Sequence, residues 1–201
     1  MKRKEHILQT ATDLFAREGY SHLAMARLAK LTGVAQGTIF YHFQSKEHLF
    51  QVILERFRAE LTDAFRQPLN ECDTGLCMLL GRMDCYFDAA GRMPSQFQLL
   101  QRHDAYEIAA DNPACLDLLK GIYDIIIGFF ESAIIKGQAD GSVAAGSAAH
   151  MAMLIFTMVD GLMRLNTYGI YDAGALYADL KRAVCRVAAG NEGEKGSAPC
   201  P

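Results

Sequence analysis

The chain has 201 residues, of which 51% are hydrophobic and 21% charged, and its formal net charge is −3. This composition is typical of a soluble globular protein, and the length allows one large or two small domains. The opening MKRKEHILQTA lacks the continuous apolar stretch of a secretory signal, so we expect a cytoplasmic protein. Neither an internal repeat nor a low-complexity tract is present in the sequence.

The charge is distributed unevenly along the chain. Residues 1–50 hold seven Lys/Arg and four Asp/Glu, a net charge of +3, so the remainder carries −6. A basic head on an acidic body suits a protein that contacts a polyanion with one end. Chance remains the alternative, because Lys2, Arg3 and Lys4 form one terminal cluster. As an arm, the same three residues could reach duplex DNA.

The first third of the chain predicts short helices joined by tight turns. Apolar residues at helical spacing predict a helix over 4–18, and Gly19 is a natural stop. Further helices are expected over 25–32 and 35–41, separated by Gly33 at a position that needs a left-handed backbone.

A long helix is expected next, with Ser45 as its N-cap and Pro68 beyond its end. The remaining sequence shows helical periodicity between Gly/Pro/Asn/Asp breakers, and no alternating strand pattern. The expected later helices are 74–90, 95–110, 113–137, 144–168 and 173–189. The prediction is an all-α protein of about nine helices.

One segment, 143–163, is apolar over nearly the length of a membrane span. It contains His150 and Asp160 and has no flanking basic anchors, so we interpret it as a buried or interface helix. Its small residues allow close helix approach, which favours a dimer interface completed by 173–189. The alternative is that both helices are buried within one subunit.

The most informative segment is 25–50, MARLAKLTGVAQGTIFYHFQSKEHLF. A helix that enters a DNA groove needs small residues at its closest approach, polar groups at its leading end and a hydrophobic back face. Residues 35–43 have all three. The order of elements predicts a helix-turn-helix domain.

From Ile7 to Phe50 the sequence resembles the TetR family of bacterial transcriptional regulators. The resemblance is carried by ILQTATDLFAREGY and LAKLTGVAQGTIFYHFQSKEHLF. It implies a three-helix helix-turn-helix DNA-binding domain over 1–50 and a helical ligand-binding and dimerisation domain over 51–189. Residues 190–201 lack apolar periodicity and are expected to be a disordered tail.

The sequence departs from the family pattern at two helix starts. Leu23 and Ala24 stand where members usually carry Ser or Thr, and Ala35 stands where Ser is common. Each change removes an N-cap, which is worth about 1 kcal/mol of helix-end stability.

The DNA contacts are assigned by side-chain chemistry. Gln36 can bond an adenine edge, Thr38 can contact a thymine methyl or a base acceptor, and Gly37 permits close backbone approach. Lys46 combines an ammonium with the free amides of a helix start, which suits phosphate. The predicted DNA-binding residues are Gln36, Gly37, Thr38, Phe40, Tyr41, His42 and Lys46.

Each of these residues could instead be only solvated, and Phe40 could belong to the core. Ile39 and Phe43 are core by spacing and receive no DNA contact.

The second domain is rich in Met, aromatic and large aliphatic residues that could line a cavity, although plain core is the alternative for any one of them. His103, Tyr106 and Asp160 have apolar sequence neighbours, and a buried polar group needs a partner, which a ligand could supply. The predicted ligand-binding residues are Met83, Tyr86, Phe87, Phe97, Leu100, His103, Tyr106, Ile126, Phe129, Phe130, Met153, Phe156, Asp160 and Met163.

The six cysteines include no CxxC pair and none of zinc-finger spacing, so we expect reduced thiols, no metal site and no cofactor. Neither a nucleophile with a recognisable base nor a phosphate loop indicates an enzyme.

The sequence therefore predicts a homodimeric repressor that binds a palindromic double-stranded DNA operator and leaves it when a small apolar or amphipathic effector binds. The long helix beginning at Lys46 would transmit the change by tilting. A cysteine-based redox-sensing regulator and a helical protein-binding module are the alternatives.

Overall fold

The computed structural model describes residues 2–69, 72–169 and 171–190. Over these residues it contains ten α-helices, one 3₁₀ helix and no strand, which confirms the all-α prediction and adds one α-helix to the expected nine. Apart from Gly190, the predicted disordered tail lies outside the described residues.

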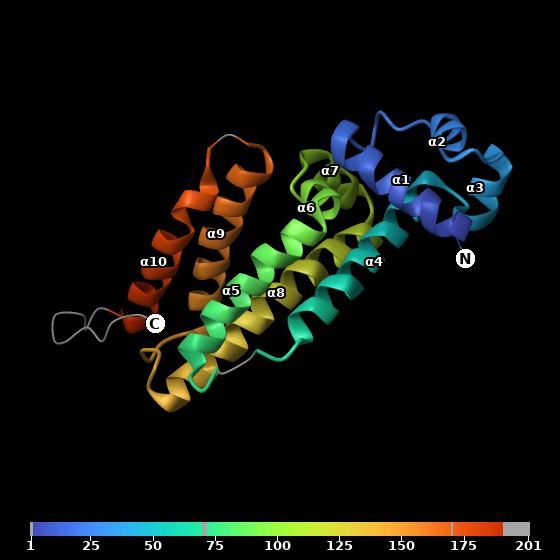
Figure 1. Ribbon diagram of the computed structural model, residues 1–201. Coiled ribbons are helices and arrows are strands. Elements are labelled where there is room, and N and C mark those ends of the chain that lie inside the picture. The colour runs from blue at the N-terminus through green and yellow to red at the C-terminus, as the bar shows by residue number, and fades with distance from the viewer. Residues whose placement is uncertain (1, 70–71, 170, 191–201) are drawn as a thin grey trace. The chain divides into compact units, whose positions relative to one another are not determined.

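The helices follow one another with short connections (Figure 1). In chain order they are α1 (Lys2–Glu18), α2 (Met25–Thr32), α3 (Gln36–Phe43), α4 (Lys46–Arg66), α5 (Gly75–Arg92), α6 (Pro94–Leu100), α7 (His103–Asp111), α8 (Pro113–Asp140), α9 (Ala148–Thr167), the 3₁₀ helix η1 (Ala173–Leu176) and α10 (Tyr177–Ala189).

The chain divides into two compact units. The first unit comprises Met1–Leu61 and Ala90–Ile122, and the second comprises Thr62–Ala89 and Tyr123–Pro201. The helices α4, α5 and α8 each contribute residues to both units.

The core of the first unit forms where α1 packs against α2 and α6. The Phe15 ring stacks on Tyr20 with centroids 5.5 Å apart and meets Phe50 edge-on at the same distance. Phe57 of α4 contacts Phe97 of α6 at 5.3 Å. Aromatic pairs at these distances add to the stabilisation from burying the rings. These contacts give the amino-terminal helices a fixed support.

The single helix expected over 95–110 is wrong, because the chain forms α6 and α7 instead. Arg102 adopts an extended backbone (φ −77°, ψ 142°) between them. Its side chain leaves the helix path, donating from Nη1 to the carbonyl of Ala16 at 3.2 Å and from Nε to Asp104 at 3.0 Å. The tertiary bonds of one arginine explain a break that local periodicity does not show.

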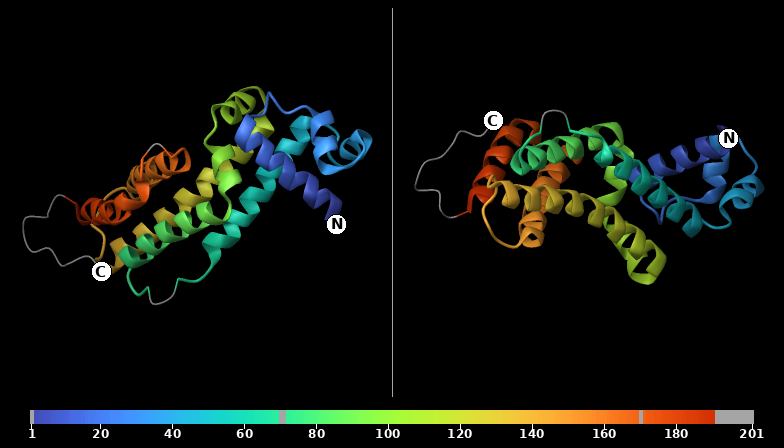
Figure 2. Two further views of the ribbon diagram at one scale, coloured as in Figure 1. Left: turned by 45° about the horizontal axis from the view of Figure 1, so that its top comes forward. Right: turned by 90° about the horizontal axis from the view of Figure 1, so that it is seen from below.

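The second unit is held by polar contacts at the ends of its helices. The Asp140 carboxylate accepts the backbone N–H of Gly75 at 2.7 Å, which ties the start of α5 to the end of α8. The N–H of Ala144 donates to the carbonyl of Ala188 at 2.7 Å. The helices α9 and α10 run side by side (Figures 1 and 2).

Two of the later helices begin differently from the prediction. The helix expected from residue 144 starts at Ala148, because the Ser147 hydroxyl accepts the N–H of His150 as an N-cap. The helix expected over 173–189 opens as the 3₁₀ turn η1 before α10 begins at Tyr177.

Among the described residues one helix, α9, is long and apolar enough to cross a membrane by length and composition alone. Of the 18-residue apolar window in this helix, 28% is buried in the structure. Such a window is weak evidence for a membrane span, because a helix of a soluble protein passes the same test. The exposed side of α9 includes Met153 and Leu154, at 51% and 52% exposure.

Candidate nucleic-acid interface

The turn between α2 and α3 depends on Gly33. Its backbone is left-handed (φ 68°, ψ 26°), and its N–H donates to the carbonyl of Ala29. Glycine adopts this conformation without the steric cost that other residues incur. The turn sits where the sequence predicts it, and α2 has the predicted bounds.

The helix α3 has one buried and one exposed face. Ile39 and Phe43 are fully buried, as their spacing predicts. On the other side Gln36 and Gly37 are exposed, and Tyr41 is 84% exposed. The buried face holds α3 against the unit, where α3 is in contact with α2 (Figure 1).

The three other predicted DNA-binding residues of this region are partly exposed. Thr38 and His42 are half-buried, and Phe40 is 39% exposed, so the core alternative for Phe40 does not hold. The His42 ring contacts Tyr41 at 5.3 Å and Phe43 at 6.1 Å. The predicted residues of α3 therefore share its accessible side and its end.

Gly37 has no internal packing role. A Cβ added there would meet no atom within 4 Å, and its backbone is not left-handed. Glycine is a poorer helix former than alanine. The fold therefore carries a destabilising residue at the exposed leading end of α3 for which its own contacts give no reason.

Lys46 lies beside α3 at the start of α4, on an aromatic support. Its Nζ is 4.3 Å from the centre of the Tyr20 ring, and burial lowers its pKa. The Tyr20 hydroxyl donates to Glu47 at 2.8 Å. Burial and the adjacent Glu47 carboxylate raise the pKa of Tyr20. The sequence includes Tyr20 in the family pattern but does not indicate this supporting role.

The α3–α4 turn ends with the predicted cap. The Ser45 hydroxyl accepts the N–H of His48 at 3.0 Å, which confirms Ser45 as the N-cap of α4. The preceding Gln44 has φ 60° and is the one described non-glycine residue with a positive φ. Its N–H donates to the carbonyl of Phe40 at 2.8 Å, which closes α3.

The starts of α2 and α3 lack side-chain caps. Their N-cap residues, Ala24 and Ala35, have extended backbones but no side-chain oxygen. The departures from the family pattern thus leave amide groups at both helix starts without a side-chain acceptor from the cap residue.

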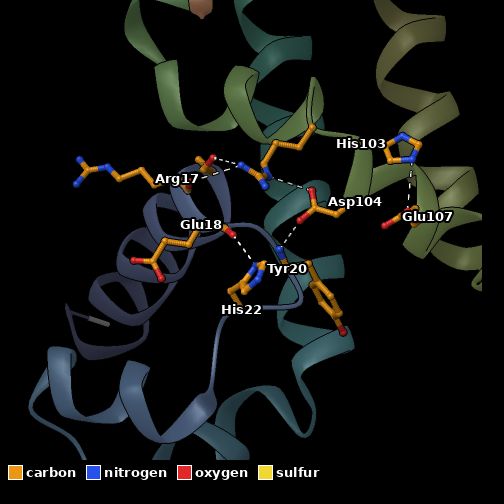
Figure 3. A network of polar contacts seen from close by, with 9 residues as sticks. Arg17, Glu18, Tyr20, His22, His103, Asp104 and Glu107 are labelled. Carbon is orange, nitrogen blue, oxygen red and sulfur yellow. Dashed lines mark hydrogen bonds and ion pairs between the residues drawn. The ribbon is translucent and has the colours of Figure 1, made fainter.

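A polar network anchors the turn before α2 (Figure 3). The Asp104 carboxylate accepts the Tyr20 N–H at 2.6 Å. The adjacent Gly19 has φ 91°, and its N–H donates to the carbonyl of Phe15 at 3.0 Å. Glu18, the last residue of α1, pairs with Arg27 of α2, and this pairing lowers the pKa of the Glu18 carboxyl.

The predicted ligand-binding residues fall in both units. In the first unit Phe97 and Leu100 are buried, whereas His103 has 88% of its side chain exposed and pairs with Glu107. Tyr106 is 39% exposed. The apolar sequence neighbours indicate that His103 and Tyr106 are buried polar groups. This expectation is wrong, because both side chains lie on the exposed part of α7.

In the second unit several predicted residues form one cluster. The Tyr86 hydroxyl donates to Asp160 at 2.7 Å, so the polar partner expected for Asp160 is a residue of the chain. Phe87 and Phe156 both contact the Tyr86 ring edge-on. The remaining members of the second unit, most of them buried, are Met83, Ile126, Phe129, Phe130, Met153 and Met163.

The cysteines differ from the expectation at one position. Cys72, Cys77, Cys85 and Cys115 are free thiols, whereas Cys185 is disulfide-bonded. No group of three or more His, Cys, Asp or Glu that could hold a metal occurs among the described residues.

Comparison with known proteins identifies the amino-terminal region. Residues 7–53 match the sequence model for bacterial regulatory proteins of the tetR family. The chain is 24% identical over 132 residues to the HTH-type transcriptional activator FasR of Mycolicibacterium smegmatis, covering 62% of this chain and 59% of that protein. It is 27% identical over 99 residues to the HTH-type transcriptional repressor KstR2 of the same organism, covering 49% and 48%.

The matches thus span about half to three-fifths of these two relatives, and both relatives are named as transcriptional regulators rather than enzymes. Among solved structures, a transcriptional regulator from Saccharomonospora viridis in complex with choline superposes with a TM-score of 0.80. It is 22% identical and covers 91% of this chain and 95% of that one. The likeness shows that this chain shares its fold with that regulator over the 91% that is covered.

Proposed function

Because this chain is a member of the TetR family of bacterial transcriptional regulators, we propose that it is a dimeric, ligand-responsive repressor of transcription. It binds a palindromic operator and leaves it when a small apolar or amphipathic effector binds. The named relatives include an activator and a repressor, so repression is the finer part of the proposal.

The exposed leading end of α3 is the observation that carries this proposal. Gln36 and Gly37 are exposed there, while Ile39 lies on the buried face of the helix. Gly37, which has no packing role in the fold, would let the backbone of α3 approach a base pair closely. Gln36 can then form two hydrogen bonds with an adenine edge, and Thr38 can contact a thymine.

Phosphate contacts would fix the orientation of α3 in the groove. Lys46, held on the Tyr20 ring, presents its ammonium near the first turn of α4. Tyr41, which is 84% exposed, and His42 have polar groups that can donate to phosphate oxygens. Such contacts position the protein without reading sequence.

Dimer formation is supported by the exposed side of α9. One subunit presents one α3, whereas a palindromic site has two half-sites about 34–36 Å apart. Met153, Leu154, Thr157 and Gly161 are exposed at helical spacing on α9. Packing this stripe against a second copy would remove apolar side chains from water and bring small residues together.

The effector proposal is supported by the second unit. Its cluster combines aromatic rings with the hydrogen-bonded pair Tyr86 and Asp160, a mixture that suits an amphipathic molecule. The structurally similar regulator from S. viridis was solved with choline. We propose that effector binding favours a tilt of α4, which has residues in both units. The effector must bind the tilted arrangement more tightly to shift the equilibrium.

Selection of bound fragments from random duplex DNA tests the DNA-binding proposal. We expect one palindromic sequence to be enriched by the purified protein. Gln36→Ala should then reduce affinity for that sequence by about 1–3 kcal/mol relative to random duplex. Gln67→Ala is the matched control, because Gln67 is exposed in the second unit.

Recovery of no duplex in dilute buffer would contradict the DNA-binding proposal and favour a protein-binding module. Enrichment of sequences without two-fold symmetry would contradict the operator part alone. Once an operator is known, repression is tested by transcription from it in vitro, with and without the protein.

A further inference from the structure

The second unit contains an open groove of about 760 Å³ between α5 and α10. Three of its lining residues are cysteines, two on α5 and one in the segment before it. The lining also includes Leu69, Asp84 and Lys181. The groove is therefore both accessible and rich in thiols.

Two of these thiols are in contact. The Sγ atoms of Cys72 and Cys77 lie 2.7 Å apart, and both residues are half-buried free cysteines. A disulfide bond joins sulfurs at about 2.05 Å, so a small displacement would suffice to form one. The five-residue separation is not a CxxC motif, which explains why the sequence does not indicate the pair.

Cys77 is held in place by the first turn of α5. Its N–H donates to the Thr74 hydroxyl at 3.2 Å. The N–H groups of the two preceding residues, Gly75 and Leu76, donate to Asp140 at 2.7 Å and to Ser142 at 3.1 Å. The Cys77 sulfur therefore projects from a turn whose backbone is fixed at three consecutive amides.

The two thiols have different surroundings. Burial and the adjacent Cys77 thiol raise the pKa of Cys72 to about 11. Cys77 lies in the first turn of α5, where its N–H is bonded to the Thr74 hydroxyl. Because Cys77 lines the open groove on a fixed turn and the raised pKa of Cys72 disfavours its thiolate, we assign the first nucleophilic step to Cys77 and the second to Cys72.

We propose that Cys72 and Cys77 form a dithiol site that a hydroperoxide oxidises to a disulfide. The Cys77 sulfur attacks one peroxide oxygen, so a sulfur–oxygen bond forms, the oxygen–oxygen bond breaks and an alcohol, or water, leaves. The Cys72 sulfur then attacks the resulting sulfenic acid. A sulfur–sulfur bond forms, the sulfur–oxygen bond breaks, and the hydroxide departs as water with the Cys72 proton. The pair loses two electrons, and the peroxide gains them.

The observations favour oxidation over metal binding at this site. The described residues contain no group of three or more metal-ligating side chains, and a structural zinc site requires four ligands. The direct contact of the two sulfurs also leaves no space between them for an ion.

Mass spectrometry of the full-length protein after treatment with hydrogen peroxide tests the site. Remaining thiols are labelled with a maleimide under denaturing conditions, and the protein is then digested with trypsin. Peptide 67–82 contains both cysteines, and we expect it to carry no maleimide label after the treatment. Its mass should be two hydrogens lower than that of the same peptide with two unlabelled free thiols. Cys85→Ser, at the third cysteine of the groove, should behave as the wild type.

Two further variants test the order of the steps. Cys72→Ser should accumulate a sulfenic acid at Cys77 that dimedone traps, whereas Cys77→Ser should show no dimedone adduct at Cys72. Full maleimide labelling of both residues after peroxide, or a disulfide to Cys85, would overturn the proposal. Equal dimedone trapping in the two variants would overturn the assigned order. None of these readouts involves DNA, so the result is independent of the proposed function.

Discussion

The carboxylate of Asp104 accepts the backbone N–H of Tyr20 at 2.6 Å, although the two residues are 84 positions apart. This bond places α7 against the turn that precedes α2 (Figure 3). The same tyrosine supports Lys46 through its ring, so α7 and the proposed phosphate contact share one residue. The position of the proposed DNA-binding surface therefore depends on contacts outside the helix-turn-helix.

Gly19 allows the Asp104 carboxylate to lie close to the backbone of this turn. We therefore expect Gly19→Ala to destabilise the protein. The residue has φ 91°, and an added Cβ would lie 2.4 Å from the Asp104 carboxylate. A non-glycine residue in such a conformation costs about 1–3 kcal/mol. We expect a loss of this size in the free energy of unfolding, measured by urea denaturation.

Gly91→Ala is the matched control for that experiment. Gly91 lies near the end of α5 and is exposed, and a Cβ added there would meet no atom within 4 Å. Alanine should stabilise this helix by up to about 1 kcal/mol. If both variants changed stability in the same direction by similar amounts, the role assigned to the Gly19 backbone would be wrong.

Lys46→Ala should weaken DNA binding in a way that depends on salt. Removing one phosphate contact should lower the slope of log affinity against log salt by about one unit, equally for operator and random duplex. Fluorescence anisotropy over a series of salt concentrations measures both slopes. Lys120→Ala removes the same charge from an exposed position on α8 and should leave the slope unchanged. An unchanged slope for Lys46→Ala would exclude Lys46 from the interface.

The helix-turn-helix was predictable because its information is local. Gly33 needs a left-handed backbone, Ser45 caps α4, and the spacing of Ile39 and Phe43 identifies the buried face. Each conclusion depends on neighbours within one or two helical turns. The structure agrees with the sequence at all of these positions.

Features that depend on distant residues were missed. The break at Arg102 follows from bonds to Ala16 and Asp104, and the first of these residues lies 86 positions away. Apolar neighbours in the sequence do not show that His103 is exposed, because the orientation of α7 decides this.

Leu154→Glu should convert the proposed dimer to monomer. Leu154 is 52% exposed on α9, and a carboxylate in an apolar interface would lose its hydration without gaining a partner. We expect the dimer dissociation constant from analytical ultracentrifugation to rise at least about tenfold, equivalent to 1.4 kcal/mol. Ile135→Glu is the control, because Ile135 is 53% exposed on α8 of the same unit. Equal dissociation of both variants would place the interface elsewhere.

Asp140→Asn should remove a pH-dependent contribution to stability. Hydrogen bonds from Ser142, and then from the Gly75 N–H, hold the pKa of the Asp140 carboxyl below its ordinary value of about 3.9. Because the folded state lowers this pKa, the contribution is fully present above the unfolded value and is lost as pH falls through the folded one. The variant should be less stable than the wild type at neutral pH. This difference in the free energy of unfolding should shrink as the pH is lowered below about 3.9.

Urea denaturation at a series of pH values measures the free energy of unfolding of both proteins. Asp124→Asn, at an exposed position on the same helix, is the control. A difference that stayed constant with pH would show that the Asp140 charge does not stabilise the start of α5.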